Sequence, residues 1–388
     1  MKHHNLFRTL LLGAIAIFTI SSCAPSAEEA AREEFAEIIA RNRAVGLAVV
    51  AVKDGEVVFS ETFGHKDLEA QEPWEDDDVL RIASISKSFA ATAILQLVEQ
   101  GKLSLDTDVA DIMGFQIRNP HYPEVPITVK MLLSHTSSMS DANGYFSFDY
   151  LNRETSPTWE KVWNKYEPGT KYQYCNLGFN TLGAIIEKVS GVRFDQYISE
   201  NILKPLGVYG NHNVHSLDPD KFVKIYTYNR RDSSFNRTKS AYELAPDALE
   251  GYRLGYPTTL FSPTGGLKIS AQDLAKVMRM HMNYGTLDGV KILEPESSKL
   301  MQSEITPTEH KDENYGMAMI RTNDLLKGQR LVGHDGLALG AYTAMYWHPE
   351  ENYGFVVMTN GCTGISDNDV FMNILCESVE CMYKHFIQ

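Results

Sequence analysis

The sequence predicts an α/β fold in which the two ends of the chain build a strand-rich part around a mainly helical middle. The first observation is a pair of β-rich runs at 47–52 and 57–63, joined by a short turn. The second is the texture of residues 110–264, which are rich in Tyr, Trp, Pro and Asn and poor in alternating strand patterns. The third is the return of strand patterns late in the chain, at 330–332, 341–347 and 354–358.

Helices are expected beside these strands. Residues 27–43 place Ala31, Phe35 and Ile38 on one face, with charged residues elsewhere. A second helix begins near Ser84 and should end before Gly101. The remaining helical patterns lie at 129–134, 177–189, 271–284 and 370–386. The prediction is one domain over residues 23–388, with an α/β part at about 30–109 and 265–388 and a mainly α part at about 110–264.

The N-terminus has the pattern of an export signal. Lys2 and Arg8 precede an apolar run from 10 to 20 that is too short to span a bilayer, and Ile20-Ser21-Ser22-Cys23 follows. This order resembles the lipobox of bacterial lipoproteins, which implies cleavage after residue 22 and a lipid on Cys23. The alternative is an ordinary secretory signal with an incidental cysteine. We expect an exported protein anchored to a bacterial membrane, periplasmic or at the cell surface.

Composition narrows the possible ligands. The net charge of −14 argues against nucleic acid as a partner, because nucleic acid binding rewards lysine and arginine patches. Loss of residues 1–22 removes two positive charges, so the remainder carries 34 − 50 = −16. The four cysteines beyond Cys23 fit no zinc spacing, so no metal and no cofactor are expected. Their disulfide state stays open; they are Cys175, Cys362, Cys376 and Cys381.

The first chemical motif is Ser84-Ile85-Ser86-Lys87, at the start of a predicted helix. Residues three apart share a helical face, so the amine of Lys87 is expected beside the hydroxyl of Ser84. The positive helix end and the lysine would both favour an alkoxide developing on Ser84. The Ser-x-x-Lys pattern is expected about once by chance in a chain of this length, so it needs support from other motifs.

The second motif is Tyr174-Cys175-Asn176. A cation near a tyrosine lowers the pKa of its hydroxyl, so Tyr174 beside Lys87 could act as a general base. Asn176 offers both a donor and an acceptor to a substrate amide or to Lys87. Tyr-x-Asn also occurs at 150–152 and 209–211, and only the surrounding sequence favours residues 174–176.

The third motif is His334-Asp335-Gly336 on a predicted strand. Strand alternation would direct His334 to the cleft, and Gly336 would let a substrate approach the backbone. A single histidine on a strand is more often structural than functional.

In this order, the three motifs resemble those of the serine β-lactamase and DD-peptidase (penicillin-binding protein) family, most closely its class C-like branch of esterases, D-amino-acid peptidases and acyltransferases. The resemblance runs from about Ala30 to the C-terminus. It implies an antiparallel sheet flanked by helices, a mainly helical domain inserted between, and an active site in the cleft. Residues 132–137 and 265–267 match further landmarks of the family and are interpreted as structural.

The resemblance also implies roles. Ser84 would attack the carbonyl carbon of an acyl substrate, and Lys87 and Tyr174 would share proton transfer. Asn176 would orient the acyl side chain, with His334 and Gly336 on the opposite wall. The backbone N–H groups of Ser84 and Leu337 would form the oxyanion hole.

Three positions depart from the family pattern. His-Asp-Gly stands where the family often has Lys-Thr-Gly or Lys-Ser-Gly, and the negative charge of Asp335 should disfavour substrates with a carboxylate beside the scissile bond, as in penicillins. Ser138 replaces a glycine after His-Thr-Ser, so a changed loop shape is expected. Cys175 is interpreted as a small buried residue; a competing thiol nucleophile is the alternative.

The sequence therefore predicts a serine hydrolase that cleaves an ester or amide of a small molecule or peptide, as an esterase, a D-peptidase or a weak β-lactamase. One alternative is an acyltransferase that passes the acyl group to an alcohol or amine. Its acceptor cleft would be lined by aromatic residues of 145–261, although core packing explains these residues more simply. The other alternative is a penicillin-binding sensor that is acylated once and does not turn over.

Overall fold

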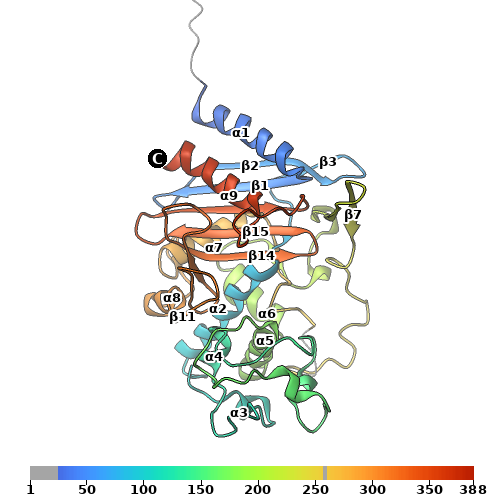
Figure 1. The fold of residues 1–388 in the computed structure, drawn as a ribbon, viewed down its shortest axis with the longest axis vertical. Coiled ribbons are helices and arrows are strands. Elements are labelled where there is room, and N and C mark those ends of the chain that lie inside the picture. The colour runs from blue at the N-terminus through green and yellow to red at the C-terminus, as the bar shows by residue number, and fades with distance from the viewer. Residues whose placement is uncertain (1–24, 257–259) are drawn as a thin grey trace, which may run out of the picture.

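The computed structural model describes residues 25–256 and 260–388 (Figure 1). The predicted signal segment and Cys23 lie outside the described residues. Within the described part of the chain, no helix is both long and apolar enough to cross a bilayer.

A nine-stranded antiparallel sheet forms the centre of the fold and confirms the predicted fold class. Its order is β11-β12-β13-β14-β15-β16-β1-β2-β3, so the last long strand of the chain pairs with the first. The two ends of the chain therefore build one sheet, as the sequence predicts. The strands are β1 (Gly46–Lys53), β2 (Glu56–Asp67), β3 (Glu72–Pro73), β11 (Thr306–Pro307), β12 (Asn314–Tyr315), β13 (Ile320–Thr322), β14 (Leu331–Ala338), β15 (Ala341–His348) and β16 (Tyr353–Thr359).

Helices cover both faces of the sheet. Strand β1 is buried on both sides, because Leu47 and Val49 pack in one hydrophobic cluster and Ala48 and Val50 in another. Helices α1 and α9 cover the first face, and α7 and α2 belong to the second cluster, which continues into the helical part below the sheet (Figure 1). The helices are α1 (Ala27–Asn42), α2 (Ser86–Glu99), α3 (Val109–Met113), α4 (Val129–Leu133), α5 (Asn176–Ser190), α6 (Phe194–Ile198), α7 (Ala271–Met282), α8 (Pro295–Met301) and α9 (Asn373–Met382).

Short elements connect the sheet to the helical part. A small sheet of β4, β8 and β5 joins the segment before Ser84 to the segment after Gly266. The other short strands form two hairpins, β6 with β7 and β9 with β10. Their bounds are β4 (Leu80–Arg81), β5 (Gly210–Asn211), β6 (Ile225–Asn229), β7 (Ser234–Thr238), β8 (Lys268–Ile269), β9 (Thr286–Leu287) and β10 (Val290–Lys291).

Short 3₁₀ and π-helical turns complete the fold. Some elements have bounds that differ from those predicted from the sequence. The C-terminal helix starts at Asn373 rather than Val370, and a π-helical turn continues it. Strand β14 extends to Ala338, beyond the predicted 330–332. The irregular turns are η1 (Ala83–Ile85), η2 (Phe148–Leu151), η3 (Trp159–Val162), η4 (Ser199–Leu203), η5 (Val214–Ser216), η6 (Pro219–Lys221) and η7 (Tyr383–Ile387).

Candidate active site

Ser84 is held in a tight turn between β4 and α2. Ala83 adopts a left-handed backbone with φ of 48°, and Ser84 lies in the 3₁₀ turn that leads into α2. The backbone before it is fixed from two sides, since Ile82 N donates to Leu267 O at 3.0 Å and Thr343 Oγ1 donates to Ile82 O at 2.9 Å. The turn thus presents the serine from a rigid base.

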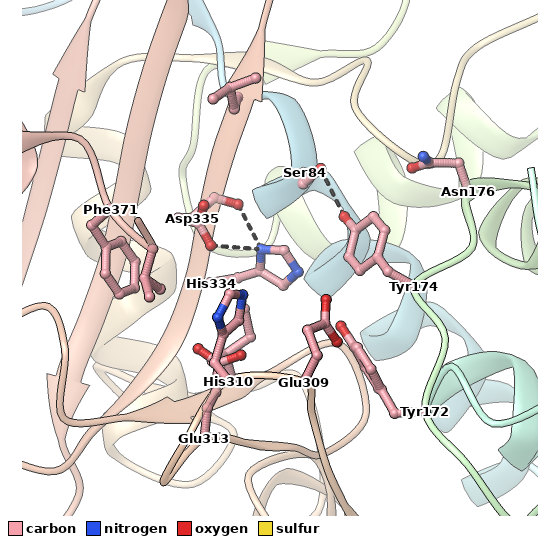
Figure 2. A pocket seen from close by; sticks show the side chains of 13 residues that line it. Ser84, Tyr172, Tyr174, Asn176, Glu309, His310, Glu313, His334, Asp335 and Phe371 are labelled. Carbon is pink, nitrogen blue, oxygen red and sulfur yellow. Dashed lines mark hydrogen bonds and ion pairs between the residues drawn. The ribbon is translucent and has the colours of Figure 1, made fainter. Parts of the chain in front are cut away.

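Two side chains, those of Lys87 and Tyr174, contact the Ser84 hydroxyl, as the sequence predicts. Lys87 Nζ lies 3.1 Å from Ser84 Oγ, and the Tyr174 hydroxyl donates to the same oxygen at 2.9 Å. Lys87 Nζ also donates to the carbonyl of Thr264 at 2.9 Å. Figure 2 shows Tyr174 and Ser84 directed toward each other, with His334 beside them.

Lys87 is fully buried, and this burial lowers the pKa of its amine to about 7. The carboxylates of Asp141 and Asp335 act in the opposite direction but do not outweigh burial. A substantial fraction of Lys87 is therefore neutral near pH 7 and can accept a proton from Ser84.

Tyr174 differs from its expected state. Burial raises the pKa of its phenol, and the hydrogen bond with Ser84 only partly opposes this. Lys87 Nζ lies 4.8 Å from the centre of the Tyr174 ring, over its face, so the lysine does not drive the tyrosine to phenolate. The resting tyrosine is a hydrogen-bond donor, and the neutral lysine is the available base.

Asn176 lies at the start of α5, to one side of the Ser84–Tyr174 pair (Figure 2). Its side-chain amide donates to Asp141 Oδ2 at 2.9 Å, and the same carboxylate accepts from the backbone N–H groups of Asn176 and Leu177, each at 2.9 Å. Asp141 thus caps the N-terminus of α5 and fixes the Tyr174–Asn176 segment. Sequence reasoning missed Asp141, because its contact with the start of α5 joins segments 35 residues apart.

His334 lies on β14 and is almost fully buried. Its Nδ1 lies 2.6 Å from the Asp335 carbonyl and its Nε2 lies 3.4 Å from the Tyr315 hydroxyl, a network that fits a proton on Nδ1. Burial lowers the pKa of this imidazole to about 3, so the ring is neutral and forms no true ion pair with the Asp335 carboxylate 4.0 Å away.

Gly336 brings β14 against the turn before the nucleophile. A Cβ atom at this position would lie 2.3 Å from Ile82 O and 2.4 Å from Thr343 Oγ1. The close approach expected here is therefore made by the chain's own Ile82 turn. Leu337, the next residue, is 58% exposed and lines the same cavity as Ser84.

The cavity above Ser84 has a volume of about 340 Å³ and an acidic wall. Glu309 and Glu313 come from the loop between β11 and β12, and Asp335 comes from β14 (Figure 2). Burial raises the pKa of Glu313 and of Asp335, and each is free of any ion pair with lysine or arginine in the described part of the chain. Sequence reasoning missed Glu309 and Glu313. The lining is completed by Tyr172, Tyr174, Asn176, His310, Ile320, His334, Leu337, Val370 and Phe371.

The structure shows the surroundings of two positions that depart from the family pattern, Ser138 and Cys175. Ser138 has φ of 59°, the left-handed backbone that glycine favours, and Asn119 Nδ2 donates to its hydroxyl at 2.9 Å. Ser138 therefore adopts the backbone that a glycine at this position would favour. Cys175 is 1% exposed, and burial with the nearby Asp141 raises the pKa of its thiol, which disfavours a thiolate nucleophile.

None of the described cysteines lines this cavity. All four are free thiols: Cys175, Cys362, Cys376 and Cys381. One group of possible metal ligands occurs in the described part of the chain: Glu34, Cys381 and His385 bring ligand atoms within 4.8 Å of one another. Lys384 Nζ already donates to the Glu34 carboxylate at 2.7 Å, which weakens the case for a cation there. Of the described aromatic residues in 145–261, Tyr172 and Tyr174 line the Ser84 cavity.

Comparison with known proteins decides the family. The family model described as Beta-lactamase matches residues 31–370. The chain belongs to the beta-lactamase family. Its sequence is 26% identical over 328 residues to Protein flp of Staphylococcus aureus strain COL, covering 81% of this chain and 59% of that protein. It is 26% identical over 317 residues to Penicillin-binding protein 4 of Amycolatopsis lactamdurans, covering 78% and 77%. The chain therefore spans under two thirds of the length of the Staphylococcus relative.

Solved structures of other proteins show the same fold. A penicillin-binding protein homologue from Pyrococcus abyssi matches with a TM-score of 0.73 and 26% identity, over 91% of this chain and 77% of that chain. EstCE1 matches with a TM-score of 0.72 and 21% identity, over 92% and 98%. D-amino acid amidase from Ochrobactrum anthropi matches with a TM-score of 0.70 and 20% identity, over 92% and 99%.

Proposed function

We propose that this member of the beta-lactamase family hydrolyses an ester or amide through an acyl-enzyme on Ser84. One observation carries the proposal: a single hydroxyl, at the base of an open cavity, lies 3.1 Å from a buried amine and 2.9 Å from a phenol. A serine needs a nearby base to become a nucleophile, and this arrangement supplies one.

The proton path follows from the state of each group. Neutral Lys87 accepts the proton of Ser84 as the hydroxyl attacks the carbonyl carbon. Tyr174, protonated at rest, donates to the same oxygen and then relays a proton between Lys87 and the leaving group. The negative oxygen of the tetrahedral intermediate would be held by the backbone N–H groups of Ser84 and Leu337, which line one cavity. Water then attacks the acyl-enzyme and releases Ser84.

The acidic wall supports a substrate with a protonated amine near the scissile bond, such as an amino-acid amide or ester. Glu309, Glu313 and Asp335 line the cavity. Among the basic groups near them, His334 is neutral and Lys87 is buried beneath Ser84, so the imidazole of His310 faces three carboxyl groups. A carboxylate at the same place would be repelled, so penicillins should be poor substrates. The similar fold of D-amino acid amidase supports the amide class.

The experiment compares phenylalanine amide, in both enantiomers, with its N-acetyl derivative and with a cephalosporin. The expected order of kcat/KM is free amine above N-acetyl, with the cephalosporin lowest. Glu313→Gln should lower kcat/KM for the free amine about tenfold, the effect of roughly 1.4 kcal/mol, and leave the N-acetyl substrate unchanged. Glu296→Gln is the matched control, because Glu296 is exposed and does not line the cavity. A preference for the N-acetyl substrate or the cephalosporin would contradict the amine assignment.

Acyl transfer and single acylation are distinguished from hydrolysis by following the mass of the acyl-enzyme with and without an added alcohol. EstCE1, a structural neighbour, is described as a hydrolase with promiscuous acyltransferase activity. Faster clearance of the acyl-enzyme when an alcohol is added would indicate transfer. An adduct that forms and does not clear would indicate a sensor.

We further propose that the protein is exported and carries a lipid on Cys23. The support is the sequence alone: a basic start, an apolar run and Ser22-Cys23 at its end. Labelling of growing cells with an alkyne fatty acid should mark the wild type and not Cys23→Ala. Equal labelling of both would contradict the assignment.

A further inference from the structure

A second, smaller cavity lies beside the Gly265–Gly266 turn and shares no lining residue with the Ser84 cavity. Its volume is about 100 Å³. Three basic side chains line it: Arg81 on β4, His212 after β5 and Lys268 on β8. The small sheet of β4, β8 and β5 brings them together from distant parts of the chain.

Two of the basic side chains of this cavity, Arg81 and Lys268, form no ion pair in the described part of the chain. Lys268 is 5% exposed, and its amine donates to the His212 carbonyl at 3.0 Å. Arg81 Nε donates to the Gly265 carbonyl at 2.6 Å. A buried cation is expected to be paired, because its removal from water is costly.

His212 provides a second, independent observation. The residue is 4% exposed and its ring packs edge-on against Phe194, with 4.8 Å between the ring centres. Both ring nitrogens are buried, and neither has a hydrogen-bond partner in the described part of the chain. A buried polar atom without a partner is uncommon, and a bound ion is one of the groups that could satisfy it.

The pKa values of Lys268 and His212 are lowered, as expected for basic groups that lack a nearby anion. Burial, together with the positive charge of the neighbouring Arg81, lowers the pKa of Lys268 to about 7. Burial also lowers the pKa of His212 well below its usual value, followed by the charges of Lys268 and Arg81. An anion among them would reverse these effects by favouring the charged forms.

We propose that Arg81, His212 and Lys268 bind a small anion of the size of inorganic phosphate or acetate. The hydroxyls of Ser240 and Ser262 line the same cavity and add possible donors. Charge-assisted bonds from lysine and arginine suit phosphate and carboxylate oxygens alike.

The proposed anion site is connected to Lys87, the proposed catalytic base, through the Thr264–Gly265 segment. Arg81 holds the Gly265 carbonyl, and the carbonyl of the preceding residue, Thr264, accepts from Lys87. Bound anion would therefore fix Arg81 and, through it, the turn that positions Lys87. The carboxylate of Glu243 also lines the cavity, but this residue is exposed. The Glu243 carboxylate is therefore the one lining group that could act as the counter-ion in place of a bound anion.

The test is the thermal stability of the purified protein in sodium phosphate, sodium acetate and sodium gluconate at equal ionic strength, with calorimetric titration of phosphate. We expect a saturable rise in Tm with phosphate or acetate and little with the larger gluconate. Lys268→Met should weaken phosphate binding at least tenfold. Lys102→Met, a change at an exposed lysine outside the cavity, should leave it unchanged.

A second variant keeps the test decisive if Lys268→Met does not fold. If Lys268→Met fails to fold by circular dichroism, His212→Phe keeps the ring against Phe194 and should show the same loss of phosphate binding. No saturable response in wild type with phosphate or acetate would overturn the proposal, as would an equal response in the folded cavity variants. Binding that appears only in Glu243→Gln would also overturn it, by showing that Glu243 is the resident counter-ion.

Discussion

The rate of acylation should follow the protonation of Lys87. The lysine is buried against Ser84 and its pKa is lowered from 10.5 to about 7. The neutral amine is the form that accepts the serine proton, so the rate should rise as pH rises through 7 and level off above it. Deprotonation changes tenfold per pH unit below the pKa, so acylation should fall about hundredfold between a plateau near pH 8 or above and pH 5.

The assay is the second-order rate of acyl-enzyme formation with a neutral activated ester between pH 5 and 9, followed by rapid quenching and mass measurement. A neutral ester removes ionisation of the substrate from the profile. Titration of His334 lies outside this range, because its pKa is about 3. Lys268, whose pKa is also about 7, and Glu313, whose pKa is raised in the Ser84 cavity, are possible confounders, so Lys268→Met and Glu313→Gln should each keep the same profile.

Two results would refute this reasoning. A rate that stays flat from pH 5 to 8 would show that Lys87 is not the base. A rate that keeps rising toward pH 10 would show that its pKa is not lowered. In Lys87→Met the rise near pH 7 should disappear together with most of the activity.

The remaining predictions concern the segments that support the site. Gly336→Ala should destabilise the protein by about 1–3 kcal/mol in urea unfolding and slow acylation, because the added Cβ would lie 2.3 Å from Ile82 O. Gly178→Ala, inside α5 with 3.6 Å to its nearest side chain, is the matched control and should be neutral or stabilising by up to about 1 kcal/mol. Asp141→Ala removes the cap of α5 and should cost about 2 kcal/mol in urea unfolding and lower kcat; unchanged stability and kcat would show that the cap does not position Tyr174.

The parts of the fold that the sequence predicts are those encoded by local periodicity. Strand β1 alternates between two buried faces, and the η1 turn with the start of α2 places Ser84 and Lys87 about one helical turn apart. Both patterns act over a few residues. The short strands β11 to β13 escaped prediction because two or three residues are too few to show a strand period.

The missing parts of the site depend on contacts between distant segments. Asp141 meets the start of α5 across 35 residues, and Lys87 meets the Thr264 carbonyl across 177. No local pattern encodes such pairs. The state of Tyr174 escaped prediction for a related reason: sequence spacing predicts a nearby cation, but the burial that dominates its pKa is a property of the packed molecule.

The central claim is that Ser84 carries the acyl group. Intact mass of the purified protein after mixing with an activated acyl ester, a phenylalanine amide and a cephalosporin tests it most directly. The account predicts a mass increase of one acyl group on wild type with at least the ester, and no adduct on folded Ser84→Ala. An adduct of the same size that persists on Ser84→Ala would contradict the account.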